Sequence, residues 1–378
     1  MVALTGKLPV SRLFQRDPNQ THTSSDGQKY YVAVDTIHAT HSYKYFGQEK
    51  GIVSYGFLDD RHRLFHSVTI SASEREAAYL VDGILHNDVV ESTIYSTDTH
   101  GFTEVNFAVT YLIRVAFAPR IQSFQDQQLY AFAGMDVPDL TAYALSPVKR
   151  IDRALIEAHW DMLLRLIVSL KQKHVTASTV LKRLNSYSQH HPLYLALRGP
   201  GRAVRTEFLL RYMDDQDLRK RIDDQLDKLE STHTFARAVF YGQNGQIPYA
   251  GKEEQQLADA CKRLVQNVIV CWNCLYLNQY LFQAPADERQ QVADAIAASS
   301  VSWQHINLHG EFDFSDEALK DSLCFDVEAL FAFQWEPQPA RSFNLCTKLL
   351  TKAIYAARRP LHCQATRGRF TPVGFEWR

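Results

Sequence analysis

The sequence is poor in cysteine and has no long apolar run. Its six cysteines all lie between Cys261 and Cys363, and so sparse a set is typical of free thiols in a reducing cytoplasm rather than of a disulfide-stabilised secreted domain. No apolar run approaches the roughly 20 residues that span a bilayer, and the N-terminus MVALTGKLPVSR has no signal-peptide core. We therefore expect a protein without membrane association.

Net charge is also lacking, but the charge is unevenly distributed. The chain has 41 Lys and Arg against 42 Asp and Glu, and the resulting charge of −1 provides no global electrostatic argument for a nucleic-acid partner. Residues 337–378 hold eight basic groups and one acid, whereas residues 1–336 carry a net charge of −8. We therefore predict that residues 337–378 form a basic tail distinct from the rest.

Common nucleotide-binding and hydrolase motifs are missing as well. The sequence contains no P-loop, no GxGxxG and no GxSxG, so neither an ATP-driven enzyme nor a serine hydrolase has a motif to support it. Cys271 and Cys274 are spaced like half of a zinc site, but they lie in an apolar helical stretch without a second pair. We predict that both are core thiols. The 46% hydrophobic content excludes a disordered chain.

The first 150 residues mix strand and helix signals. The turn-forming Ser24-Ser25-Asp26-Gly27 precedes the first strand, a Ser73/Glu76 capping box opens one helix, and Thr103 caps another. The order is β-β-β-α-β-α-β, which predicts a mixed α/β domain. The expected strands are residues 28–34, 52–57, 64–70, 93–97 and 115–118.

From residue 151 onward the apolar spacing becomes helical. Helices are expected over residues 151–170 and 176–186, and a Gly199-Pro200-Gly201 break separates them from a long helical run at 205–241. A further helix covers residues 253–281.

Three carboxylates are the candidate chemical groups. Asp26 and Asp98 lie at the edges of predicted strands among small polar residues, where a metal ion or phosphate can approach them, although each is also a common turn former. Glu230 follows Leu226 by four residues on an apolar helical stripe, where a carboxylate is costly unless it pairs with a base such as Arg237 or binds metal. Together the three are suited to binding two divalent cations for phosphoryl transfer. Glu311 in LHGEFDF competes for the third position.

Four blocks of sequence resemble the catalytic region of one family. SSDGQKYYVAVDTIHATHSYKYFGQEKGIVSY, STDTHGFTEVNFAVTYLI, LDKLESTHTFARAVFYGQNGQI and VSWQHINLHGEFDFS, spread over about residues 8–335, resemble the Tn-three family of replicative, cointegrate-forming bacterial transposases. The resemblance implies an α/β, RNase H-like mixed sheet flanked by helices, interrupted by an α-helical insertion and followed by further C-terminal helices. It implies an Asp-Asp-Glu triad at Asp26, Asp98 and Glu230, although this chain has LDKLE where the family usually has glycine before the glutamate.

The same resemblance implies the activity and its partners. The triad would hold two Mg²⁺ ions, for which Mn²⁺ can substitute, to nick DNA at transposon ends and join the 3′-hydroxyl to target DNA. The expected partners are double-stranded DNA, namely terminal inverted repeats and target, and a second copy when the protein is full length, at the nucleoid in the bacterial cytoplasm. His100, His233 and Arg237 are candidates for contacts behind the metal site or with DNA. Possible DNA-backbone contacts are Lys29, Lys44, Arg120 and Arg202.

The resemblance also suggests how the chain is divided. Residues 1–23 are expected to be an entry segment left by a missing N-terminal region, 24–150 the first part of the core, 151–204 a helical insertion, and 205–335 the catalytic-Glu helix and C-terminal helices. The tail at 337–378 has no counterpart in the family, and read-through or frameshifted sequence is favoured over an added DNA-contacting arm. Two rivals stay open: an inactive transposase remnant that binds DNA or full-length transposase, and a nuclease of the same fold.

Overall fold

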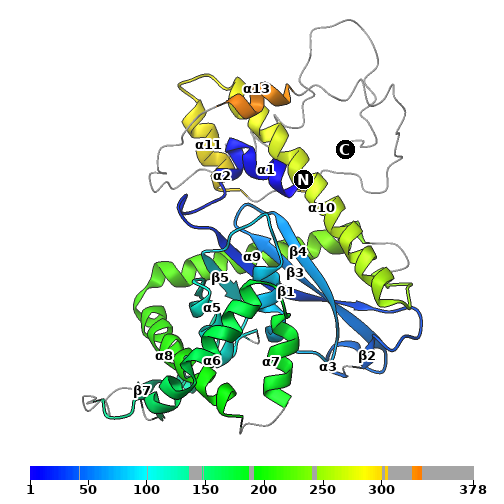
Figure 1. Ribbon diagram of the computed structural model, residues 1–378. Helices are drawn as coiled ribbons and strands as arrows, with labels where there is room; N and C mark the ends of the chain where they lie inside the picture. The colour runs from blue at the N-terminus through cyan, green and yellow to red at the C-terminus, as the bar shows by residue number, and fades with distance from the viewer. Residues whose placement is uncertain are drawn as a thin grey trace, which may run out of the picture.

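The computed structural model describes most of the chain. Within the described residues a mixed sheet carries helices on both faces (Figure 1), which confirms the expected mixed α/β class. The described residues are 1–41, 43–99, 101–135, 147, 149–186, 191–240, 245–299, 303–304 and 326–333.

The central strand of the sheet is β1 (His22–Tyr31), which has one antiparallel and one parallel neighbour. On the antiparallel side lie β3 (Lys50–Asp59) and then β4 (Leu64–Ser71), the hairpin that the sequence predicts. On the parallel side lie β5 (Ile94–Thr97) and β6 (Ala116–Phe117), also near their predicted positions. The short β2 (Thr40–His41) pairs with the start of β3, and β7 (Tyr130–Phe132) and β8 (Lys149–Ile151) form a separate pair.

The first strand begins earlier than predicted. Ser24-Ser25-Asp26-Gly27, expected as a turn, lies inside β1, because β3 and β5 flank it on both sides. The buried hydroxyls find partners that local sequence does not reveal: Ser25 Oγ lies 2.5 Å from the Tyr55 hydroxyl, and Gln225 Nε2 donates to Ser24 Oγ at 3.0 Å. The pairing satisfies the backbone and side chains that a turn would have left to water.

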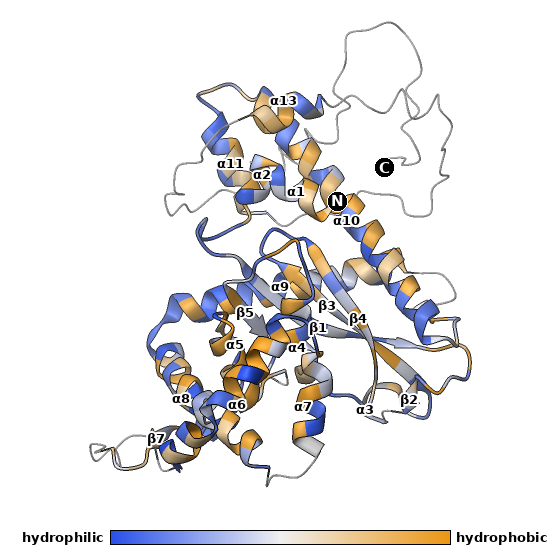
Figure 2. Ribbon diagram, in the orientation of Figure 1, coloured by the Kyte–Doolittle hydropathy of each residue, from blue (hydrophilic) through white to orange (hydrophobic). Residues whose placement is uncertain are grey.

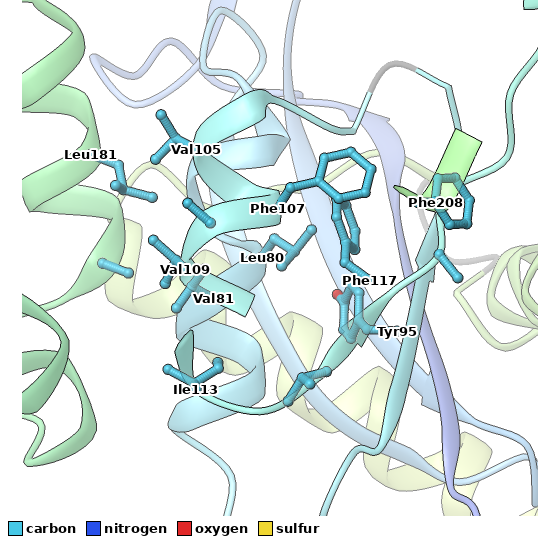
Figure 3. Packing of buried hydrophobic residues seen from close by; sticks show 14 of the residues in the cluster. Leu80, Val81, Tyr95, Val105, Phe107, Val109, Ile113, Phe117, Leu181 and Phe208 are labelled. Atoms are coloured by element: carbon cyan, nitrogen blue, oxygen red, sulfur yellow. The ribbon is translucent and has the colours of Figure 1, made fainter. Parts of the chain in front are cut away.

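One face of the sheet packs on the main apolar core. The rings of Phe57 on β3, Tyr95 on β5 and Phe117 on β6 follow one another across the sheet. Phe107 points from α5 (Glu104–Leu112) toward Phe117 and Phe208 (Figure 3). Figure 2 shows apolar residues concentrated on α5, at the centre of this packing. The helices that complete this face are α4 (Leu80–Leu85), α6 (Arg153–Lys171), α7 (Ala177–Ser186) and α8 (Pro192–Asp214).

The opposite face is covered by α9 (Gln216–Val239) and α10 (Lys252–Gln283). Phe57 belongs to the main core, while its neighbour Leu58 packs on Leu229 of α9, as expected because successive strand residues point to opposite faces. Further elements are α1 (Val2–Lys7), α2 (Pro9–Arg12), α3 (Tyr43–Phe46), η1 (Glu76–Ala78), η2 (Phe124–Asp126), α11 (Arg289–Ala297) and α13 (Val327–Ala332).

A second apolar cluster joins the N-terminal helices to α10. Leu8 and Val10 pack there with Ile269 and Cys274. Cys271 and Cys274 are buried and free, which confirms the prediction of core thiols. None of the helices in the described ranges combines the length and apolar character needed to cross a membrane.

The Gly199-Pro200-Gly201 sequence does not break a helix, so that prediction is wrong. It lies inside α8, and the helix ends instead at Asp215, whose side chain caps α9 by accepting from the Leu218 amide at 2.8 Å. The glycines allow close packing: a Cβ at residue 201 would lie 1.8 Å from the Glu104 carbonyl oxygen of α5. The expected division between residues 204 and 205 therefore falls inside one helix.

The Ser73/Glu76 capping box is also wrong. The η1 turn follows Arg75 with no side-chain cap, and α4 begins only at Leu80. The Glu76 carboxylate lies against Gly27 of β1, where a Cβ would come 2.1 Å from Glu76 Oε1. The Glu76 carboxylate thus contacts β1 instead of capping a helix that begins after Ser73. By contrast, Thr103 caps α5 as predicted, accepting from the Asn106 amide at 3.2 Å.

The buried His62 predicts a loss of stability in mild acid. Burial lowers the pKa of His62 to about 3 from its usual 6.5. At a pH between these two values, His62 is therefore protonated in the unfolded chain but neutral in the folded chain. Stability therefore falls as the pH drops below 6.5, by about 2 kcal/mol at pH 5 for this group. His62 has a φ of 62°, which asparagine tolerates, so His62→Asn is the matched variant. Urea unfolding at pH 7 and 5 should show a smaller drop for the variant; an equal drop contradicts the assignment.

Candidate active site

The parallel pairing of β1 and β5 brings the two predicted aspartates together. Ser24 lies opposite Ser96 and Ser25 opposite Thr97, so the next residues in register, Asp26 and Asp98, are at the same level. Asp98 directly follows the last residue of β5, which places its side chain where the strand ends. Both carboxyl side chains are accessible, at 38% and 40% exposed. Two residues 72 positions apart in sequence therefore lie at the same level of neighbouring strands, at the point where β5 ends.

Helix α9 brings the third carboxylate to the same face. Asp26 pairs across β1 and β3 with Gly56, on the face that α9 covers. His233 of α9 places its Nδ1 3.8 Å from Asp26 Oδ2, and Gln28 Nε2 donates to the His233 carbonyl at 2.9 Å. Glu230 lies three residues before His233 and so on the same side of the helix.

The expectation that Glu230 lies on a buried stripe is wrong. The Glu230 side chain is exposed, whereas the buried positions of α9 are Ile222, Gln225, Leu226, Leu229, Phe235 and Ala236. The helical repeat continues from Leu226 to Leu229 rather than to residue 230, so this carboxylate bears little desolvation cost. Within the part of the chain that the structure describes, Arg237 does not pair with it; the Arg237 guanidinium donates to Thr234 Oγ1 at 3.2 Å.

The three carboxylates interact electrostatically. Burial raises the pKa of Asp26, and the negative charges of Asp98 and Glu230 raise it further, against a hydrogen bond to the Gly27 backbone and the charge of Lys29 that lower it. Mutual repulsion of this kind disfavours three ionised carboxylates without a nearby cation. Arg120 supplies one positive charge: its Nη2 lies 2.9 Å and its Nε 3.2 Å from Asp98 Oδ1.

His233 is neutral at ordinary pH. Its pKa falls to about 4, first because it is buried and then because Lys262, Arg237 and Lys29 are positively charged. Its contact with Asp26 is therefore that of a neutral ring with a carboxylate rather than an ion pair. Two other candidates, His100 and Glu311, lie outside the described residues, as does the side chain of Lys44.

Sequence reasoning missed Glu76 as a neighbour of the site. Burial, followed by the charges of Asp26 and Asp98, raises the pKa of Glu76 to about 7. Its position depends on Gly27, which has no side chain to exclude the carboxylate from the strand. The only sequence signal was the spacing from Ser73, and that suggested a helix cap instead.

A match to a family model accompanies this geometry. The model described as Tn3 transposase DDE domain matches residues 1–312. The chain belongs to this family.

Curated relatives agree with this membership of the Tn3 DDE domain family. The chain is 36% identical over 297 residues to the transposase for transposon Tn2501 of Escherichia coli, and 34% identical over 297 residues to that for Tn21 of Escherichia coli. It is 31% identical over 299 residues to the transposase for Tn1546 of Enterococcus faecium. These matches cover 77%, 77% and 79% of this chain but 29%, 30% and 30% of the relatives. The chain thus spans about 30% of the length of these relatives.

Membership of a DDE transposase family implies dependence on a divalent metal, and the donor set fits one. Asp26, Asp98 and Glu230 offer only carboxylate oxygens, which hard divalent cations prefer. Burial is the main cause of the raised pKa of Asp26, and the negative charges of Asp98 and Glu230 add to it. Among the described residues no three His, Cys, Asp or Glu side chains are gathered closely enough to ligate one ion. Arg120 pairs with Asp98 in this arrangement.

A buried polar network lies next to Asp26 and connects β1 with α9 and α10. Lys262 of α10 pairs with Asp259 at 2.7 Å and donates to the Tyr30 hydroxyl at 3.3 Å. Tyr30 in turn donates to Gln28 Oε1 at 2.8 Å, and Gln28 holds the backbone of His233. The network ties α9 and α10 to β1 next to Asp26, so β1 and α9, which carry Asp26 and Glu230, are held in one arrangement.

Proposed function

We propose that this chain is the catalytic part of a DNA transposase that nicks transposon ends and transfers the 3′-hydroxyl to target DNA in replicative, cointegrate-forming transposition. The observation that supports this most directly is that Asp26, Asp98 and the helix α9, which carries Glu230, come together where β5 ends, in a chain of the Tn3 DDE domain family. A transposase needs no covalent nucleophile, because metal-assisted in-line displacement uses a water or hydroxyl.

We also propose that the fold is RNase H-like. The strand order β4-β3-β1-β5-β6, antiparallel on one side of β1 and parallel on the other, supports this assignment. Within it, residues 24–150 would form the first part of the core, 151–204 the inserted helices, and 205–335 the part that contains the catalytic glutamate. The basic tail at 337–378 lies outside the described residues.

In the proposed mechanism Asp26, Asp98 and Glu230 hold the metal. Two Mg²⁺ ions, with Mn²⁺ as a substitute, would supply Lewis-acid activation of the attacking oxygen and charge stabilisation of the leaving oxygen. Arg120 neutralises Asp98 and lies where it can donate to a phosphate oxygen of the bound strand. Neutral His233 and the Gln28 hydrogen bond orient Asp26 relative to α9.

The partners follow from the proposed reaction. Double-stranded DNA, as terminal inverted repeats and as target, is the substrate, and the full-length protein is proposed to act as a homodimer at the nucleoid.

A nicking assay tests the proposal. The purified chain is incubated with an end-labelled transposon-end duplex and a scrambled duplex, with Mn²⁺, Mg²⁺ or EDTA. It is tested alone and joined to the part of the Tn2501 transposase that the match does not cover. We expect metal-dependent nicks in the end duplex and joining to a target duplex. Cleavage without end preference and without joining supports a nuclease of the same fold instead. Activity only in the joined protein gives the isolated chain the role of an inactive remnant.

A further inference from the structure

Three arginines of α8 gather around a single carboxylate. Arg198 Nε lies 2.6 Å and Arg202 Nε 3.1 Å from Glu104 Oε2, and Arg205 Nη1 lies 4.0 Å from Glu104 Oε1. They follow one another at helical spacing, so they share one face of α8. Glu207 is only two positions from Arg205, which directs it away from this face. The arginine cluster, Arg198, Arg202 and Arg205, therefore has a surplus of two positive charges over Glu104.

The arginine cluster is held in place by aromatic rings. Each guanidinium lies over one: Arg198 over Tyr194 at 5.7 Å, Arg202 over Tyr130 at 5.0 Å and Arg205 over Phe102 at 5.7 Å. Such stacking holds a planar guanidinium in one orientation before a ligand binds. The compact ammonium of lysine, on its flexible stem, is not oriented in this way.

The carboxylate inside the cluster is firmly ionised. Burial alone would raise its pKa, but hydrogen bonds from Arg198 and Tyr130 and the charges of Arg202 and Arg198 lower the pKa of Glu104. Glu104 therefore neutralises one arginine and no more.

The outer edges of two guanidiniums remain available. Arg198 and Arg202 turn their Nε atoms toward Glu104, and their Nη atoms have no hydrogen-bond partner among the described residues. The side chains are 28% and 26% exposed. Two parallel donors on a fixed, partly exposed guanidinium match the oxygens of a phosphate.

The cluster lies beside the end of β5. Phe102, under Arg205, is four residues after Asp98, which limits the separation of their Cα atoms to about 14 Å. That span corresponds to about four nucleotides of a duplex strand, and the Arg205 guanidinium lies beyond it, 5.7 Å from the centre of the Phe102 ring. The surrounding helical segment is also the basic part of this portion of the chain: residues 151–211 hold ten Lys and Arg against four Asp and Glu, a charge of +6, while the rest of the chain carries −7.

We propose that Arg198 and Arg202 bind backbone phosphates of duplex DNA a few nucleotides from the bond that is cleaved, while Arg205, whose Nη2 donates to Gln127 Oε1 at 2.5 Å, adds positive charge beside them. The inference rests on the proposed function for the identity of the ligand, and it assigns to α8 a role in positioning the strand over Asp98. Phosphate contacts fix register without reading sequence, so this site binds end and target DNA alike.

The test separates DNA binding from cleavage. Fluorescence anisotropy measures the affinity of the full chain for a DNA duplex at several salt concentrations, with EDTA present so that metal-dependent cleavage does not occur. The proteins compared are the wild type, the Arg198→Gln/Arg202→Gln double variant and Arg202→Lys. The control is Arg165→Gln, which removes one exposed charge of the same segment on α6. We expect the double variant to lose on the order of tenfold in affinity and its salt slope to fall by about two. Arg202→Lys should keep the slope and lose less affinity.

Each outcome decides one point. The phosphate site is wrong if the double variant keeps the affinity and salt slope of the wild type, or if Arg165→Gln loses as much affinity per charge. In either case, metal-dependent nicking by the wild type still supports the proposed function. A loss confined to the cluster variants in a chain that never nicks DNA supports the site and rejects the function. A wild type that binds no duplex rejects both. If the double variant has a lowered melting temperature, the decision rests on Arg202→Lys, which keeps the charge but not the planar guanidinium. A loss of affinity in this variant supports the phosphate site, and wild-type affinity contradicts it.

Discussion

Replacing Asp98 by Asn is expected to reduce metal-dependent nicking by more than about a hundredfold. Mutating groups that merely support a metal ligand costs ten- to a hundredfold, so loss of a ligand should cost more. The amide keeps the shape of the side chain but removes the charge that, with Asp26 and Glu230, attracts the cation. The rate of nicking with Mn²⁺ and the Mn²⁺-induced rise in melting temperature are both measured, and both should disappear.

The fold should survive this change. Asp98 and Arg120 are 40% and 35% exposed, and an ion pair so accessible to water contributes no more than about 1 kcal/mol. The control is Asp161→Asn, an exposed carboxylate of α6 far in sequence from the triad. Unchanged metal-dependent nicking in the Asp98 variant would show that the metal-site assignment is wrong.

Replacing Gly201 by Ala should lower the free energy of unfolding by about 3 kcal/mol. The added Cβ would lie 1.8 Å from the Glu104 carbonyl oxygen and 3.2 Å from the Ala108 amide nitrogen, so α8 must move away from α5. Overpacking against fixed backbone reaches the upper end of the usual cost, and it outweighs the gain of about 1 kcal/mol that alanine brings to a helix interior. Urea unfolding followed by tryptophan fluorescence measures the difference.

Gly199→Ala is the matched control on the same helix. Its Cβ would meet Ile156 Cδ1 at 2.6 Å, the far end of a flexible side chain that can rotate. We expect a clearly smaller loss there, because the gain in helix propensity offsets part of the clash. Equal stability of the Gly201 variant and the wild type would mean that α5 and α8 do not pack as closely as described.

The near-zero net charge is a sum of unlike parts that the fold separates. The carboxylates of the site lie on the face of the sheet covered by α9, whereas the arginine cluster lies on α8 against α5, on the other side. Overall charge therefore says little about a DNA partner, since phosphates respond to the local field beside them.

Elements with a strong local signal were predictable. The hairpin of β3 and β4, the Thr103 cap of α5 and the long α10 all follow from periodicity and capping that act within a few residues. Asp26 and Asp98 stood out for their small polar neighbours, and four sequence blocks identified the family. These features need no information about distant parts of the chain.

Features that depend on distant partners were not predictable. Ser24-Ser25-Asp26-Gly27 has turn residues yet forms the middle of a sheet, because β3 and β5 supply its hydrogen bonds. Gly199-Pro200-Gly201 has helix breakers yet continues a helix, because α5 needs the space at residue 201. In both places tertiary packing outweighs the local preference, which in a helix interior amounts to about 1 kcal/mol for each glycine and about 3 kcal/mol for proline.

The sequence by itself therefore determined the strand and helix content, the family and the residues proposed as the triad. Only the tertiary structure decided that Glu230 is exposed, that Arg120 pairs with Asp98, that Glu76 lies against Gly27, and that three arginines share Glu104. The physical reason is that the charge and burial of a side chain depend on its neighbours in space. The register of β1 with β5 and the packing of α8 on α5 determine those neighbours, and they bring together residues 70 or more positions apart in the sequence.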